Sequence, residues 1–320
     1  MAQSEKSRSL EGRIVTVLGG GGFLGRHLAQ ELLGRGARLR IASRNPKRAF
    51  FLKPLGNLGQ VQFVACDVTQ PETLARALAG SDAVVNLVGA FTGDLDAIQG
   101  QGAGRIAEAA RVAGARAMVH VSALGADAGS DVAYARTKAE GEQAVLAAFP
   151  AATILRPSIL FGPDDNFINM LARAIATFPI LPVFGPEAKL QPVFVDDVAE
   201  AIANALSTPA AHGGGIYAVA GPDVMTMLDL NERIAAAQDR KRLFAPLPDG
   251  VAGAIATLTG WAPGAPITRD QWKLLRAGSV AESGTDGLKA LGVSPRPLSL
   301  FLDRWMVTYR KHGRFHVAAA

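Results

Sequence analysis

The sequence predicts an α/β protein built on a doubly wound parallel sheet, with a smaller lobe interleaved toward the C-terminus. Two observations support this fold class. From residue 13 to about residue 156, short apolar runs alternate with helical patterns, which is typical of βαβ units. Beyond Pro157 the alternation gives way to proline-rich loops and two helix starts. This change indicates a second lobe that also completes the sheet.

The elements follow from these runs in chain order. We expect strands at residues 14–18, 39–43, 61–65, 83–87, 117–122 and 153–156. We expect the helices between them at residues 24–35, 71–79, 104–113 and 133–149. Because connections between parallel strands are right-handed, the loops that follow the strands should gather along one edge, where ligands bind.

Length and composition exclude disordered and fibrous proteins. The chain has 320 residues, of which 49% are hydrophobic, so it can bury a substantial core. Its single cysteine, Cys66, excludes an intrachain disulfide and favours a reducing compartment. The net charge of +5 permits an anionic cofactor, an acidic partner or an anionic membrane surface without requiring nucleic acid. The five histidines lack metal-ligand spacing, so no metal site is expected.

A glycine-rich turn follows the first predicted strand. It reads Gly19-Gly20-Gly21-Gly22-Phe23-Leu24-Gly25, with the spacing G-x-x-G-x-x-G, and it opens the first helix. Glycine lets backbone N–H groups approach a pyrophosphate, which then lies at the positive end of the helix. The strand-turn-helix context predicts a Rossmann-type dinucleotide site. A flexible glycine loop without a ligand is the alternative.

The end of the second strand indicates which dinucleotide is bound. A site selective for NAD(H) usually has an acidic residue here, which binds the ribose 2′-hydroxyl. This sequence has Ser43 and Arg44 instead, followed by Lys47 and Arg48. Because a guanidinium can pair with a 2′-phosphate in a bidentate manner, we expect NADP(H), and NADPH in particular, with NAD(H) as the alternative. A solvated basic loop remains the alternative for Lys47 and Arg48.

Further strand ends complete the predicted groove. Asp67 and Val68 follow the third strand and are expected near the adenine. The run from Asn86 through Leu87, Val88 and Gly89 follows the fourth strand and is expected to line ribose and phosphates. Ser122 and Pro157, which follow the fifth and sixth strands, are further candidates for cofactor contact.

Tyr134 and Lys138 are the candidate chemical groups. They stand four residues apart on the predicted helix 133–149, so they project from one face. An ammonium beside a phenol would lower the pKa of the phenol, which a tyrosine acting as a general acid requires. The lysine could also hold ribose hydroxyls. A surface pair is the alternative.

With these motifs in place, the sequence resembles the extended and atypical short-chain dehydrogenase/reductase superfamily. The resemblance also includes Arg156-Pro157 followed by Phe161-Gly162-Pro163, and the run 194–198. In that superfamily the tyrosine transfers a proton, the lysine binds the nicotinamide ribose, and a serine orients the substrate. Many extended members end the fifth strand with two serines, whereas this chain has Ser122 and then Ala123. The departure puts full dehydrogenase chemistry in doubt and leaves Tyr134 and Lys138 as vestigial or cofactor-anchoring groups.

The C-terminal segments 266–275, 301–305 and 309–315 look like those of the NADPH-binding accessory subunit of respiratory complex I. This resemblance implies a dinucleotide held for structural or regulatory purposes, with other complex I subunits as partners. It also implies a peripheral location on the cytoplasmic face of a bacterial inner membrane, or alternatively on the matrix face of the mitochondrial inner membrane. We therefore divide the chain into a leader (1–12) that lacks the apolar core of a signal peptide, a dinucleotide-binding domain (13–160), a mixed segment (161–298) and a basic C-terminal docking segment (299–320).

The basic C-terminal segment combines cations with aromatic residues. Arg304, Arg310, Lys311 and Arg314 alternate with Trp305, Tyr309 and Phe315. This composition suits an anionic membrane surface or an acidic protein surface, and a plain solvated helix is the alternative.

Two other functions remain open. The first is an NADP-dependent oxidoreductase or epimerase that acts on a sugar nucleotide, an isoprenoid or a quinone precursor, as Tyr134 and Lys138 would allow. The second is a redox-sensing regulator whose partner affinity depends on the cofactor. We interpret Asp197-x-x-Glu200 and Thr226-x-x-Asp229 as helix caps, and Asp164-Asp165 as part of a solvated loop.

Overall fold

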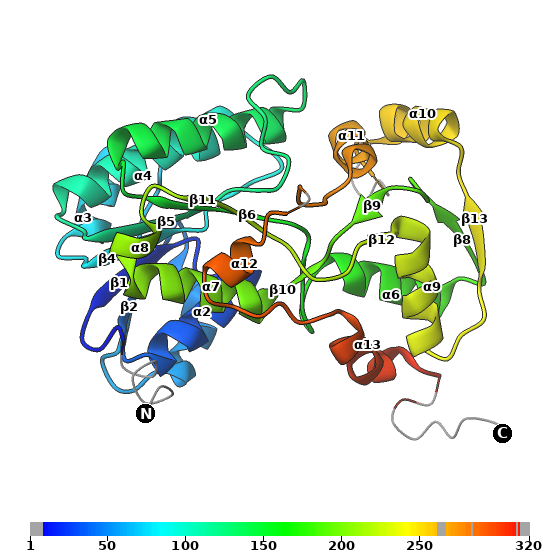
Figure 1. The fold of residues 1–320 in the computed structure, drawn as a ribbon, viewed down its shortest axis with the longest axis horizontal. Coiled ribbons are helices and arrows are strands. Elements are labelled where there is room, and N and C mark those ends of the chain that lie inside the picture. The colour runs from blue at the N-terminus through cyan, green and yellow to red at the C-terminus, as the bar shows by residue number, and fades with distance from the viewer. Residues whose placement is uncertain (1–8, 261–266, 283, 312, 314–320) are drawn as a thin grey trace. The chain divides into compact units, whose positions relative to one another are not determined.

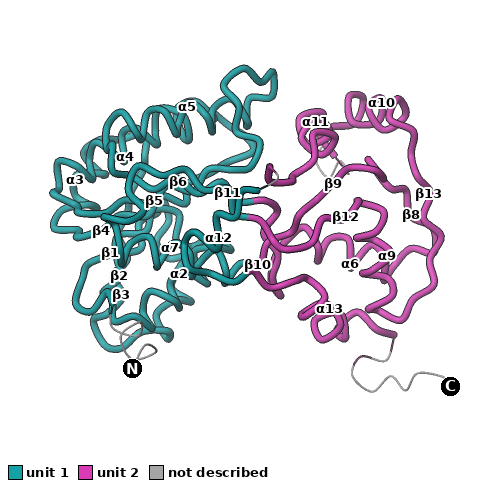
Figure 2. Tube along the Cα trace, viewed as in Figure 1, with its two compact units in different colours: residues 1–157, 195–219, 283–294 teal, residues 158–194, 220–282, 295–320 magenta. Residues whose placement is uncertain are grey.

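The chain folds into two compact units, shown in Figure 2. The structure is a computed structural model, and it describes residues 9–260, 267–282, 284–311 and 313. Unit 1 comprises residues 1–157, 195–219 and 283–294, and unit 2 comprises residues 158–194, 220–282 and 295–320. Most of the leader, Pro266, Arg314 and Phe315 therefore lie outside the described residues.

Unit 1 contains a parallel sheet with seven strands among the described residues, in the order β11-β6-β5-β4-β1-β2-β3. The strands are β1 (Ile14–Leu18), β2 (Arg38–Ser43), β3 (Val61–Ala65), β4 (Ala83–Asn86), β5 (Ala117–Val121), β6 (Thr153–Pro157) and β11 (Ile216–Val219). The strand order reverses between β1 and β4, which is the switch point where ligands bind in doubly wound sheets. The predicted α/β fold class is confirmed.

Helices cover both faces of this sheet (Figure 1). One face carries α3 (Pro71–Leu78), α4 (Gln101–Val112) and α5 (Ala133–Ala148), and the other carries α2 (Phe23–Gly34) and α7 (Val195–Ser207). Shorter elements of the unit are η1 (Pro46–Leu55), η2 (Asp96–Gly100), α8 (Pro209–His212) and α12 (Gly287–Ala290). Because helices cover both faces, β5 is buried along its whole length and carries apolar residues at nearly every position.

A core between the sheet and α4 fixes the strand ends. Leu18, Val84, Ile106 and Met118 are each at most 1% exposed and belong to one apolar cluster. Burying a side chain of this size stabilises a fold by about 1.5–3 kcal/mol. The loops after β1 and β4 therefore leave from a rigid base.

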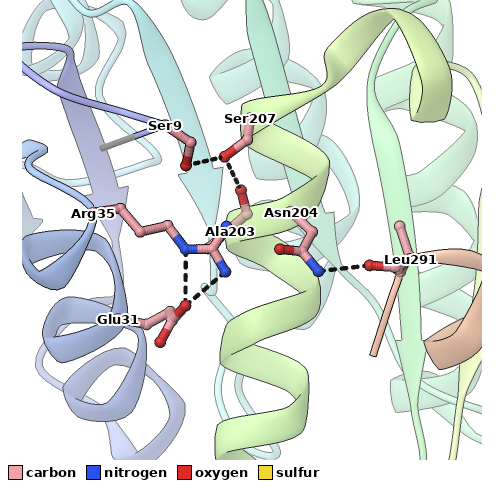
Figure 3. A network of polar contacts seen from close by, with 7 residues as sticks. All are labelled: Ser9, Glu31, Arg35, Ala203, Asn204, Ser207 and Leu291. Carbon is pink, nitrogen blue, oxygen red and sulfur yellow. Dashed lines mark hydrogen bonds and ion pairs between the residues drawn. The ribbon is translucent and has the colours of Figure 1, made fainter. Parts of the chain in front are cut away.

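A polar network lies in unit 1 near the C-terminal ends of α2 and α7, at the edge of the sheet opposite the loops after β1 and β4 (Figure 3). Ser9 Oγ lies 2.9 Å from Ser207 Oγ, and Asn204 Nδ2 donates to the Leu291 carbonyl at 2.7 Å. A shallow pocket of about 340 Å³ is bordered by these residues and by Arg35, whose guanidinium donates to Glu31. Since helices run antiparallel to the strands, this pocket is at the amino-terminal edge of the sheet, away from the glycine turn.

Unit 2 is built from short strand pairs and helices. Its strands are β7 (Leu160–Phe161), β8 (Ile180–Val183), β9 (Lys189–Leu190), β10 (Val193–Phe194), β12 (Met225–Thr226) and β13 (Leu243–Pro246). They form the pairs β7-β10, β9-β12 and β8-β13. The helices are α6 (Phe167–Thr177), α9 (Met227–Ala237), α10 (Asp249–Thr259), α11 (Arg269–Ala277), α13 (Ser299–Met306) and η3 (Val307–Tyr309). Trp272 of α11 packs with Ala252 and Ala256 of α10 in a small core.

Three local predictions fall in this half of the chain, of which one is confirmed and two are wrong. Thr226 and Asp229 form the predicted capping box at the start of α9. The predicted cap at Asp197 is wrong in position, because α7 begins at Val195 and encloses this residue in its first turn. The solvated loop at Asp165 is also wrong: the side chain is 4% exposed and accepts hydrogen bonds from the backbone N–H groups of Ile168 and Gly162. Burial raises the pKa of Asp165, although these bonds oppose the shift.

Candidate functional site

The glycine turn is shaped by two close approaches. Gly19 has a φ of +76°, and a Cβ placed there would lie 3.1 Å from the Leu87 carbonyl carbon. A Cβ on Gly25 would lie only 2.4 Å from the Gly20 carbonyl oxygen, so the first turn of α2 packs directly on the loop. Gly22 is the N-cap of α2, and no side chain caps this helix start. The arrangement leaves backbone N–H groups and a helix N-terminus for an anion, as a pyrophosphate requires.

The loop after β4 is held against this turn by two buried polar side chains. Asn86 Oδ1 accepts the backbone N–H of Val88 at 2.9 Å, and Asn86 Nδ2 lies 2.9 Å from His120 Nδ1. Burial lowers the pKa of His120 to about 3, so its ring is neutral and its Nδ1 accepts from the amide. This arrangement fixes the expected loop 87–89 beside Gly19.

The residues expected around the adenosine end lie on β2, β3 and the loops that follow them. Asp67 Oδ1 accepts two hydrogen bonds from Thr69, which, together with the nearby Arg44 charge, hold the pKa of Asp67 below its usual value. Arg44 is exposed, and so is Lys47 at the start of η1. Val68 is 9% exposed and belongs to the core, so only its backbone can border a ligand.

Lys138 lies between the loop after β4 and strand β5. Its Nζ donates to the Val121 carbonyl at 3.1 Å and would be 3.3 Å from a Cβ on Gly89. The side chain is 3% exposed, and burial lowers the pKa of Lys138 to about 8, although the Glu142 carboxylate opposes the shift. Lys138 therefore lies close to the loop 87–89, whose residues are expected to line the ribose.

The expected electrostatic effect on Tyr134 is wrong. The ring stacks on Phe91, with centroids 4.5 Å apart and planes 13° apart. Burial raises the pKa of Tyr134 to about 12, and the ammonium of Lys138 does not offset this effect. Since the buried phenolate is penalised and Lys138 Nζ is directed to a carbonyl on β5, Tyr134 is a neutral phenol at physiological pH.

Two hydroxyl groups at strand ends lack protein partners among the described residues. Ser43 Oγ and Ser122 Oγ are both buried without a hydrogen bond there. Pro157 ends β6, which pairs with β5 next to Ser122, and its carbonyl accepts the Leu124 N–H, whereas Ser43 ends β2 on the other side of β1. Buried hydroxyls without partners are costly, so these two atoms fit a site where a polar ligand supplies the missing contact.

Two contributors were not identified from the sequence. Phe91 carries no motif, and its stacking on Tyr134 depends on the path of an irregular loop. Gln99 bridges the same region, because its Oε1 accepts the Ala90 N–H and its Nε2 donates to Thr137. The sequence around Gln99 gives no signal for this role, because the neighbouring residues 94–102 include other polar side chains.

No group of three or more His, Cys, Asp or Glu side chains in the described ranges is arranged to hold a metal ion. Over the same ranges, the helices are too short or too polar for one to span a bilayer.

Comparison with known proteins defines the family. The sequence pattern of the NAD dependent epimerase/dehydratase family matches residues 15–220. The chain belongs to this family, and its site is one for a nicotinamide dinucleotide. A solved structure, the triphenylmethane reductase of Citrobacter sp. complexed with NADP(H), shares the fold with a TM-score of 0.74 and 22% identity, covering 91% of this chain and 99% of that one.

Within the family, the chain is similar to a particular group of subunits. It is 34% identical to NADH dehydrogenase (ubiquinone) 1 alpha subcomplex subunit 9, mitochondrial, of Rattus norvegicus, over 91% of this chain and 79% of the relative. The subunit of the same name from Dictyostelium discoideum is 32% identical over 97% of this chain and 88% of the relative. The chain therefore belongs to the subunit 9 family, which confirms the resemblance inferred from the C-terminal segments.

Proposed function

We propose that this protein is an NADP(H)-binding accessory subunit of proton-pumping NADH:ubiquinone oxidoreductase, complex I, and that it holds its cofactor for structural or regulatory purposes. The observation that carries this proposal is the similarity to subunit 9, which extends over nine-tenths of the chain and includes the C-terminal half. The glycine turn with its two close approaches supports a retained dinucleotide.

The bound dinucleotide is NADPH rather than NADH. The support is Arg44, which is exposed just beyond the end of β2 where selective NAD(H) sites have a carboxylate. Phosphate is doubly charged and accepts a guanidinium in a bidentate manner, whereas a 2′-hydroxyl gains little from it. Arg44→Ala should weaken NADPH binding by about tenfold or more and leave NADH binding nearly unchanged, as measured by calorimetric titration. Equal losses for both cofactors would refute the assignment.

The cofactor is held rather than turned over. Ala123 supplies no hydroxyl where the superfamily has its catalytic serine, and desolvation raises the pKa of the half-buried Tyr134 to about 12. Phe91 covers one face of the Tyr134 ring. Lys138 binds ribose hydroxyls next to Gly89 and thereby anchors the nicotinamide half. A nicotinamide can exchange hydride when bound, but these residues offer poor proton transfer to a substrate.

The partners are other complex I subunits, and the chain is peripheral to the membrane. We place it on the cytoplasmic face of a bacterial inner membrane, with the mitochondrial matrix face as the alternative. The segment 299–320 is proposed to dock on an anionic membrane surface through cations such as Arg304 and Lys311, which are exposed.

Native purification tests the function directly. A tagged copy of this chain in its own host should co-purify with NADH:ubiquinone oxidoreductase activity, and bound NADPH should be released on denaturation. If the tagged chain is recovered without other complex I subunits, the proposal fails. A variant with Gly25→Ala should assemble less complex, since the dinucleotide site would be damaged.

Tyr134 and Lys138 on one face of α5 favour a second candidate, an NADP-dependent oxidoreductase or epimerase acting on a sugar nucleotide, an isoprenoid or a quinone precursor. In this case the purified protein should oxidise its bound NADPH with a member of one of these classes, and Tyr134→Phe should abolish that activity. Absence of NADPH oxidation across the three classes would reject this candidate.

A further inference from the structure

We propose that unit 1 carries a second docking surface, for an anionic phospholipid bilayer, formed by Arg48, Phe50, Phe51, Lys53, Leu55 and Leu58. We call it the 48–58 surface. The inference rests on the proposed function only in that both place the chain at a membrane. It concerns a different unit from the segment 299–320.

The 48–58 surface exposes large apolar side chains on a segment that is firmly attached to the fold. Phe50, Phe51 and Leu55 are 40–43% exposed, and Leu58 is fully exposed. Ala49 and Leu52, in the same segment, are at most 1% exposed and anchor η1 on the sheet edge. The exposed residues therefore belong to an ordered element.

Leu58 is presented at the tip of a turn. The Gln60 N–H donates to the Asn57 carbonyl, and the Asn57 N–H donates to Gln60 Oε1, both at 3.0 Å. Gly59 provides the left-handed backbone that the turn requires, with a φ of +76°. A rigid apolar tip of this kind suits insertion between lipid headgroups.

The charged side chains of the segment around the 48–58 surface are all positive. Residues 44–66 contain the cations Arg44, Lys47, Arg48 and Lys53 and no Asp or Glu. Lys53 Nζ lies 3.9 Å from the centroid of the Phe50 ring, and the Arg26 guanidinium lies 4.6 Å from that of Phe51. Cations that flank exposed rings match the phosphate layer of an anionic bilayer, which attracts the charges while the rings enter the interface.

A bilayer fits these observations better than an acidic protein. A protein partner would need a pocket shaped for the projecting Leu58, and matched carboxylates at fixed positions. A lipid surface needs neither, because it deforms around a projection and supplies phosphates over its whole area. A convex, basic and apolar segment is thus better matched to lipid.

The experiment measures binding of the purified full-length chain to vesicles by co-sedimentation. We expect binding to vesicles of equimolar phosphatidylcholine and phosphatidylglycerol, weaker binding at high salt, and little binding to phosphatidylcholine alone. The double change Phe51→Ser with Leu58→Ser, and separately Arg48→Ala with Lys53→Ala, should each lower the partition coefficient by about tenfold or more. Arg44 and Lys47 are left intact, since they are assigned to the cofactor.

The matched control is Val112→Ser with Leu258→Ser, which removes two exposed apolar residues that are 72% and 73% accessible and lie outside the surface. This variant should bind as the parent does. The double change Arg304→Ala with Lys311→Ala reports the contribution of the segment 299–320. Bound NADPH and the melting temperature confirm that each variant is folded.

Two outcomes would overturn the inference. The first is unchanged vesicle binding by both surface variants. The second is an absence of vesicle binding by the parent while the surface variants lose association with complex I, which would identify an acidic protein as the occupant. Because vesicle binding uses the isolated chain, it stays informative even if co-purification with complex I fails.

Discussion

The two ends of the dinucleotide site in unit 1 are constrained differently. At the phosphate end, the turn 19–25 has backbone contacts so close that a methyl group would not fit at Gly25. At the tyrosine end, Ala123 stands where the superfamily has a serine, desolvation raises the pKa of Tyr134, and Phe91 covers its ring. The turn 19–25 therefore keeps the close backbone geometry that a pyrophosphate requires, whereas the proposed function has the groups for proton transfer altered. If the proposed function holds, the difference teaches that binding a cofactor and using it chemically are separable properties of one fold.

The largest expected effect is at the phosphate end. Gly25→Ala places a Cβ 2.4 Å from the Gly20 carbonyl oxygen, so the turn must shift. We expect NADPH affinity to fall by about a hundredfold and the free energy of unfolding to fall by about 1–3 kcal/mol. Gly34→Ala, at the other end of α2 with open space around it, is the control and should be neutral or stabilising. Normal NADPH binding by the Gly25 variant would contradict the assigned turn.

The next effect is at the loop between the two ends. Asn86→Ala removes the acceptor of the Val88 N–H and the donor to His120, and both groups are left without their partner in a buried region. We expect a loss of about 1–3 kcal/mol in the free energy of unfolding and weaker NADPH binding. Chemical denaturation measures the first and calorimetry the second. Asn57→Ala, at an exposed asparagine, should change neither.

A pH-dependent effect is expected at Lys138, whose folded pKa of about 8 lies below its unfolded value of 10.5. Between these values the unfolded chain binds the extra proton, so the free energy of unfolding should rise with pH in this window. Cofactor phosphates favour the ammonium, so NADPH affinity should fall as pH rises through about 8. Titrations on either side of this pH test the sign. Lys138→Met should bind NADPH more weakly and lose this dependence, while Glu142 and the neutral His120 remain as neighbours.

The smallest effect is expected at the tyrosine end. Tyr134→Phe keeps the ring that stacks on Phe91 and removes only a neutral hydroxyl. We expect less than about a threefold change in NADPH affinity and little change in melting temperature. A large loss of cofactor affinity would show that the hydroxyl anchors NADPH, and the contrast between the two ends would then disappear.

The sequence predicts a feature well when residues nearby in the chain determine it, and poorly when distant residues do. The six strands of the first half and the glycine turn are specified by short apolar runs and by residue spacing, and all are present within a residue or two. The pKa of Tyr134 was mispredicted because it is determined by burial and by a distant loop residue, Phe91. Asp165 was mispredicted for a similar reason, since a turn of backbone N–H groups encloses it. The strand β11 has no local signal that distinguishes it from the strands of unit 2.

The assembly of unit 1 from three separate stretches of chain has a consequence for biosynthesis. Strand β11 covers the edge of β6, and α12 packs on β11 so closely that a Cβ on Gly287 would lie 2.2 Å from the Ala218 carbonyl oxygen. Strand β11 and helix α12 leave the ribosome only after most of the chain has been synthesised. Until then the nascent polypeptide presents an open β-edge, which is a site for mispairing. This edge therefore stays open until residues 216–219 have emerged from the ribosome.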